Sequence, residues 1–142
     1  MSEGTFQKIK NTGEKMYGPL KVLVCGYQPD DQELFLSLLG QVGMGNVPVV
    51  FINEEDSEIT LKDLLYRADR SGFGKTSRMR RAVITSGFTQ KGLHLLISTY
   101  NQVGLPAQLW AALTPISEKW SINHLLEELA KEAAAIKRAK NK

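Results

Sequence analysis

The residues best suited to bind a ligand follow short apolar runs that end at a glycine or a small polar residue. Backbone N–H groups at a helix start bind anions, and the helix expected after Thr89 has no acidic residue in its first turn. A phosphate or carboxylate is therefore the expected ligand type. The candidate cleft residues share a place at the carboxyl ends of expected strands: Gly26, Tyr27, Asn53, Gly87, Phe88, Thr89 and Thr114.

Basic residues form a second candidate site. Residues 67–142 carry thirteen Lys/Arg against five Asp/Glu, whereas residues 1–66 carry five against ten. Such a basic excess can bind nucleic-acid phosphates or an acidic protein surface. No helix-turn-helix accompanies it, and Phe73 is the one aromatic residue among the linker cations. The candidate nucleic-acid residues are Arg70, Lys75, Arg78, Arg80 and Arg81.

Catalytic groups are not arranged in a recognisable motif. Cys25 is the single cysteine and falls inside an expected strand, where a thiol acts as a small apolar side chain. His94 and His124 are the two histidines, and no motif places a carboxylate beside either. No catalytic residue, metal site or cofactor is therefore predicted. This favours a non-enzymatic protein and leaves enzymatic activity as an open question.

The chain repeats itself at an offset of 61 residues. Residues 20–68 align without a gap on residues 81–129, and nine of the 49 positions are identical, a clear excess over chance. The identical pairs include Gly26/Gly87 and Gly43/Gly104. This pattern indicates an internal duplication. The alternative is a chance similarity between two amphipathic units.

Each half is predicted to contain a strand, a helix, a second strand and a second helix. The apolar runs 20–25, 47–52, 81–86 and 108–113 are typical of buried strands. Helices are expected to begin at Pro29 and after the capping residues Thr60, Thr89 and Ser121.

This alternation predicts an α/β fold with a four-stranded parallel sheet in the order 2-1-3-4. The long helices are expected on opposite faces, related by a pseudo-two-fold axis parallel to the strands. Ligands bind such sheets beyond the carboxyl ends of the strands, where the strand order reverses. The candidate cleft residues should therefore line one crevice.

The length of 142 residues fits one domain. We expect a flexible leader over 1–19 and a single domain over 20–140, built from repeats 20–68 and 81–129. A basic linker over 69–80 joins the repeats, and the end of the last helix is expected to project. No apolar run approaches the roughly 20 residues that a membrane span needs. A cytoplasmic protein without a membrane partner is therefore expected, and a homodimer stays open.

The second half of the chain also resembles a known family. Ser86-Gly87-Phe88, Leu105-Pro106, Thr114-Pro115 and Trp120 follow one another over residues 81–132. This order is similar to that of the bacterial domain of unknown function 3783. The resemblance implies a small bacterial cytoplasmic α/β protein, and it carries no activity, ligand or catalytic residue.

The leading hypothesis is a non-enzymatic module that binds a small ligand or a protein in a regulatory role. One alternative is a nucleic-acid-associating protein that uses the basic linker and the basic C-terminal tail. A second alternative is an enzyme that acts on a small phosphorylated molecule.

Overall fold

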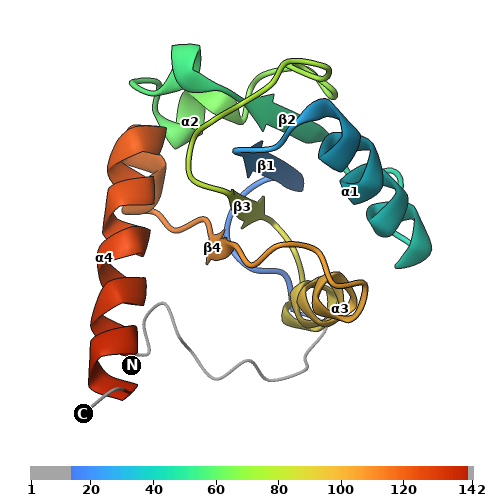
Figure 1. Cartoon of the computed structure of the whole chain (residues 1–142). Coiled ribbons are helices and arrows are strands. Elements are labelled where there is room, and N and C mark those ends of the chain that lie inside the picture. Colours follow the sequence, from blue (N-terminus) through green and yellow to red (C-terminus); the bar gives the residue numbers. More distant parts are fainter. Residues whose placement is uncertain (1–13, 141–142) are drawn as a thin grey trace.

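The computed structural model describes residues 14–140, so most of the expected leader lies outside the described residues. Figure 1 shows a sheet with helices on both faces. In chain order the elements are β1 (Lys21–Cys25), α1 (Pro29–Gln41), β2 (Val49–Ile52), η1 (Glu54–Asp56), α2 (Leu61–Leu64), β3 (Ala82–Ser86), α3 (Gln90–Gln102), β4 (Leu109–Ala112), η2 (Ser117–Lys119) and α4 (Ile122–Lys140).

The four strands lie in the order β2-β1-β3-β4, as the sequence predicts. The prediction of an all-parallel sheet is wrong. β1 is parallel to β2 and β3 is parallel to β4, but β1 and β3 are antiparallel, with Leu23 opposite Ile84. The linker permits this reversal because it runs along β2 and reaches the carboxyl end of β1 before β3 begins. There Ser77 N–H donates to the Tyr27 carbonyl (3.1 Å), and β3 begins with Ala82 opposite Cys25.

The expectation that the two long helices cover opposite faces is also wrong. α1 and α3 pack on one face of the sheet, where Phe35 and Leu96 share one buried cluster. α2 and α4 pack on the other face, where Leu61 and Leu125 share a second cluster. Both βαβ crossovers take the same hand. Turning one unit antiparallel to the other within the sheet therefore keeps both crossover helices on the same side.

Many contacts recur at the 61-residue offset. Leu61 N–H donates to the Trp120 carbonyl (3.0 Å), and Ile122 N–H donates to the Ile59 carbonyl (2.9 Å). Thr60 forms an antiparallel bridge with Ser121, its own counterpart at this offset. Such reciprocal contacts are those of an approximate two-fold axis perpendicular to the sheet. The expected axis parallel to the strands is replaced by this one.

The predicted helix starts are confirmed. Pro29 is the first residue of α1. The hydroxyls of Thr60, Thr89 and Ser121 accept hydrogen bonds from N–H groups three residues later, at 3.2, 2.9 and 3.1 Å. α4 continues past the sheet, and its residues 131–140 are exposed (Figure 1). Within residues 14–140, no helix combines the length and apolar character that crossing a bilayer requires.

Candidate functional site

The antiparallel junction divides the predicted cleft. Because β1 and β3 run in opposite directions, their carboxyl ends lie at opposite ends of the sheet. The single crevice predicted from the sequence is therefore wrong. One end of the sheet carries Gly26, Tyr27 and Asn53, and the other carries Gly87, Phe88, Thr89 and Thr114.

Gly26 and Gly87 each lie beneath a crossing segment of backbone. Gly26 has φ +80°, and a Cβ atom there would lie 2.5 Å from the Met79 carbonyl oxygen. Gly87 has φ +72°, and a Cβ atom there would lie 2.6 Å from the Gly18 carbonyl oxygen. The protein's own chain therefore passes over each strand end, where a ligand was expected.

The polar candidates at these ends are engaged by neighbouring backbone. Thr89 caps α3, as described above. Asn53 Oδ1 accepts from Glu55 N–H (2.9 Å), and Thr114 Oγ1 accepts from Ser117 N–H (2.9 Å). Phe88 and Tyr27 are buried in the α1/α3 core. These contacts give the side chains structural roles.

Arg81 forms the centre of a polar cluster that the sequence does not reveal. Its guanidinium lies 3.8 Å from the centre of the Tyr27 ring, and its Nη1 lies 3.0 Å from Asp31 Oδ2. Its Nε donates to the Tyr100 hydroxyl (3.0 Å), and the Tyr27 hydroxyl donates to Gln108 Oε1 (2.7 Å). Burial lowers the pKa of Arg81, but Tyr100, Tyr27 and Asp31 outweigh this effect and raise it. Arg81 therefore serves the core of the fold.

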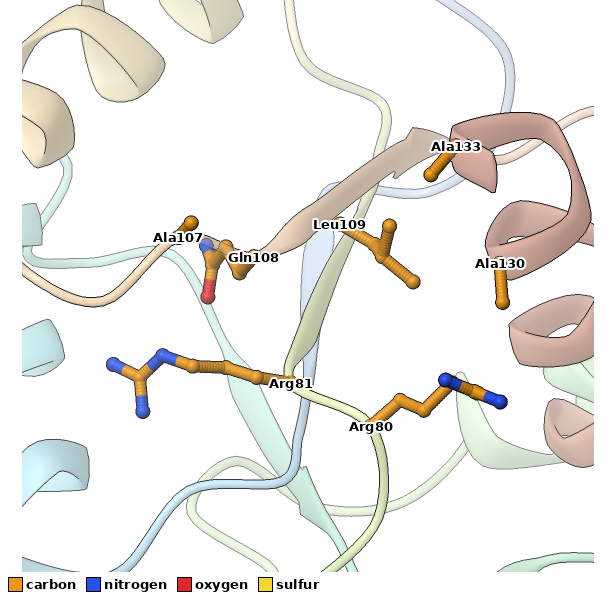
Figure 2. Close-up of a pocket in the computed structure, with 7 residues that line it drawn as sticks. All are labelled: Arg80, Arg81, Ala107, Gln108, Leu109, Ala130 and Ala133. Atoms are coloured by element: carbon orange, nitrogen blue, oxygen red, sulfur yellow. The ribbon is translucent and has the colours of Figure 1, made fainter. Parts of the chain in front are cut away.

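The other basic candidates have surroundings that differ from those of the Arg81 guanidinium. Arg70 pairs with Asp69 (2.6 Å) beside β2. Lys75, Arg78 and Arg80 are exposed, and Arg80 lies on the α4 side of the sheet, away from the Arg81 guanidinium (Figure 2). The Gln32 side chain holds the linker, because it accepts from Gly74 N–H (2.8 Å) and donates to the Lys75 carbonyl (2.9 Å).

Two hollows follow one side of α4. The larger is about 430 Å³ and lies between α4 and the start of β4 (Figure 2). The smaller is about 220 Å³, and Arg80 lines both. The larger hollow is lined by Arg80, Arg81, Ala107, Gln108, Leu109, Ala130 and Ala133. The smaller hollow is lined by Glu54, Ser57, Met79, Arg80, Asn123, Leu126 and Glu127.

The start of β4 borders the larger hollow, and the outer edge of this strand is open. Leu109 N–H donates to the Arg81 carbonyl (3.0 Å), and Leu113 N–H donates to the Thr85 carbonyl (2.8 Å). Alternate residues of a parallel strand bond to the same neighbour. The N–H and C=O groups of Trp110 and Ala112 therefore face away from β3. No residue between 14 and 140 bonds to them.

The side chains usual in catalysis are dispersed. Across residues 14–140, no three His, Cys, Asp or Glu side chains are grouped closely enough to hold a metal ion. His94 and His124 are exposed and lie on different helices. Cys25 is fully buried, and this burial raises the pKa of its thiol from the ordinary value of 9.0. The thiol is therefore a core group and not a ready nucleophile.

Replacing either crossing-point glycine by alanine is expected to lower the free energy of unfolding by about 2 kcal/mol or more, because a left-handed φ and a backbone clash act together. Gly40→Ala is the matched control. Gly40 is helical with no atom near its would-be Cβ, so alanine there should stabilise the protein by about 0.5–1 kcal/mol. Urea unfolding measures all three variants. Tolerance of Gly26→Ala or Gly87→Ala would show that the crossings are misplaced.

Arg81→Ala is expected to lower the free energy of unfolding by about 2–3 kcal/mol, because Asp31 and Tyr100 lose a half-buried partner. Arg80→Ala removes the same charge from an exposed neighbour and should change it by less than about 0.5 kcal/mol. Thermal unfolding compares the two variants. Equal effects would contradict the role assigned to Arg81.

Raising the pH from 8 to 10 is expected to lower the free energy of unfolding. The pKa of Cys25 is higher in the folded chain, so this contribution is complete below the unfolded value of 9.0 and is lost as the pH rises above it. The Cys25→Ala variant has no thiol to titrate and should lose less stability over the same interval. An identical pH dependence in both proteins, measured by urea unfolding, would rule out this contribution.

The comparisons with known proteins support the resemblance found in the second half of the chain. Among curated proteins and among solved structures, none matches this chain. One family model does match it, over residues 81–136, which comprise β3, α3, β4 and most of α4. The family resemblance is thereby confirmed: residues 81–136 are similar to the family described as Domain of unknown function (DUF3783).

Proposed function

We propose that the protein is a non-enzymatic binding module that takes up an extended segment of a partner protein along the outer edge of β4. The observation that carries this proposal is the open row of backbone groups at Trp110 and Ala112. An extended peptide can add to such an edge as a further strand, because its main chain supplies the missing donors and acceptors.

The opposite edge of the same sheet supports this proposal because its outward backbone groups are covered. β2 is also an edge strand, but the linker covers it. Arg70 N–H donates to the Val49 carbonyl (2.7 Å), and Phe51 N–H donates to the Ser71 carbonyl (2.8 Å). Val49 and Phe51 are the counterparts of Trp110 and Ala112 at the 61-residue offset. The same backbone groups are therefore satisfied on one edge and open on the other.

The composition of β4 also favours strand addition. Folded proteins commonly protect an edge strand with charged residues, proline or a covering segment. Residues 107–113 contain no charged residue and no proline. All four residues of β4 are partly exposed, whereas β2 is fully buried. Nothing in the sequence of β4 therefore discourages an incoming strand.

The hollow beside β4 gives the proposed site a means of selecting its partner. Alternate side chains of an added strand point toward the same face of the sheet. One of them can enter the larger hollow, whose apolar wall includes Leu109, Ala130 and Ala133. Arg80 is exposed beside it and has no ion pair within the described residues. A carboxylate on the partner would match this cation.

We further propose that the two halves arose by duplication of one βαβα unit. The recurrence of hydrogen bonds and of glycine crossings at the same offset supports this proposal. On this view one copy acquired a cover for its edge strand and the other copy became the binding half. A bacterial origin and a cytoplasmic location belong to the same proposal, and the family resemblance supports them.

Ala112→Pro is expected to abolish strand addition, because proline removes an outward N–H while breaking no bond to β3. Peptides selected from a random displayed library against the wild-type protein should bind this variant at least about tenfold more weakly. Ile116→Pro is the control. Ile116 is exposed, and its φ of −81° already suits proline.

The proposal fails if the selected peptides bind the Ala112→Pro protein as well as the wild type. It also fails if the peptides change the amide chemical shifts of the protein only outside residues 107–113. Preserved amide spectra of both variants establish that each is folded.

A further inference from the structure

We infer that the outer edge of β4 pairs with the same edge of a second copy of the chain, and that this two-fold dimer withholds the edge from a partner strand until it dissociates. This inference rests on the proposed function, because it names a regulator of the same site. Both strands in the pairing are β4 itself, Leu109–Ala112, which lies within the described residues.

The open backbone groups of β4 are arranged symmetrically about Ala111. Trp110 and Ala112, whose N–H and C=O groups face outward, lie on either side of it. In an antiparallel ladder, two opposed residues can exchange both of their N–H···O=C bonds. A two-fold axis that passes between the Ala111 residues of two copies, perpendicular to the sheet, places Trp110 of each copy opposite Ala112 of the other. Every outward group of these two residues then has a partner.

The side chains of β4 suit the same register. Trp110 packs on the α1/α3 face of the sheet, and Leu109, Ala111 and Leu113 pack on the α2/α4 face. Opposed residues of an antiparallel pair lie on the same face. The large Trp110 ring therefore lies beside the small Ala112 side chain of the second copy. On the other face Ala111 lies beside itself, and Leu109 lies beside Leu113. All of these pairs are apolar, and none opposes two bulky rings.

The position of α4 leaves room for this pairing. Ala130 and Ala133 line the larger hollow together with Leu109, so α4 passes the start of β4 and not its centre (Figure 2). A two-fold axis at Ala111 places the second α4 at the start of the second β4. The two helices then lie on the same face, on opposite sides of the axis, and run in opposite directions.

The charges of α4 favour a second copy as the occupant. The acidic residues of α4 all lie at or before position 132, and its last turn is basic, with Lys137, Arg138 and Lys140. α4 continues beyond the β4 edge, so this basic end reaches over the second copy (Figure 1). Because the two helices run in opposite directions, the basic end of each approaches the acidic part of the other. Such complementary charges favour this orientation of the two copies.

Sedimentation equilibrium of the full-length chain tests the inference. A short edge-to-edge contact is small for a stable interface, so the wild type should pass from monomer to dimer between about 1 μM and about 1 mM. Ala112→Pro removes an outward N–H group and should raise the dissociation constant of the dimer at least about tenfold. Ile116→Pro should leave this constant unchanged. An excess of a library-selected peptide should return the wild type to a monomer.

Ala111→Lys separates self-pairing from partner binding. Residue 111 faces itself in the dimer, so two lysines repel each other and should raise the dissociation constant at least about fivefold. Ala111→Glu alone should act in the same way, and an equal mixture of the two variants should restore the dimer. Selected peptides without a basic residue should bind Ala111→Lys at least as tightly as the wild type. Amide spectra establish that both variants are folded.

Isotope-filtered spectra of mixed labelled and unlabelled wild type should show a contact between the Ala111 Hα atoms of the two copies. A protein that stays monomeric up to about 1 mM overturns the inference. A dimer that lacks this contact, or that survives Ala112→Pro unchanged, also overturns it. If peptides bind the edge and no dimer forms, the inference fails and the proposed function stands. If the dimer forms and no peptide binds, the proposed function fails and the pairing of two copies stands.

Discussion

The antiparallel pairing of β1 with β3 is the contact on which the rest of the structure depends. Leu23 faces Ile84 at its centre, and the two βαβ units extend outward from this pair. Because one unit is turned around within the sheet, the crossover helices α1 and α3 pack on one face, and α2 and α4 pack on the other. The same reversal separates the carboxyl ends of the two central strands. No shared crevice can then form at the switch point of the strand order.

The linker that permits this reversal also makes the two edges of the sheet unequal. On leaving α2 the chain passes along β2 and bonds to the outward N–H groups of Val49 and Phe51 and to the Val49 carbonyl. After α4 begins, the second half continues as helix and leaves the corresponding groups of β4 without a described partner. Within the described residues, the two halves therefore have nearly equivalent hydrogen bonds but differ at their edge strands, where the outward N–H and C=O groups of β4 are available to another chain. This difference is the physical basis of the proposed binding role.

Local features of the fold could be predicted from the sequence, and the strand direction at the junction could not. Pro29 and the three hydroxyl caps define the helix starts through chemistry within one helical turn, so the predictions there are confirmed. The strand order also follows from the alternation of elements. A buried strand such as β1, however, has the same apolar character in a parallel and an antiparallel pair. The direction depends on distant contacts of the linker, such as those of Gln32, which no local pattern indicates.

Cross-strand nuclear Overhauser effects between β1 and β3 test the central pairing most directly. Opposed residues that are not hydrogen-bonded to each other in an antiparallel ladder have Cα atoms only about 4.5 Å apart. Val22 N–H donates to the Pro48 carbonyl and the Thr85 carbonyl accepts from Leu113 N–H, so these two residues bond to the outer strands and not to each other. Strong Hα–Hα cross peaks are therefore expected for Val22 with Thr85 and for Val24 with Val83. The account would be contradicted if every such peak were absent from fully assigned spectra and the contacts between β1 and β3 were instead those typical of parallel strands.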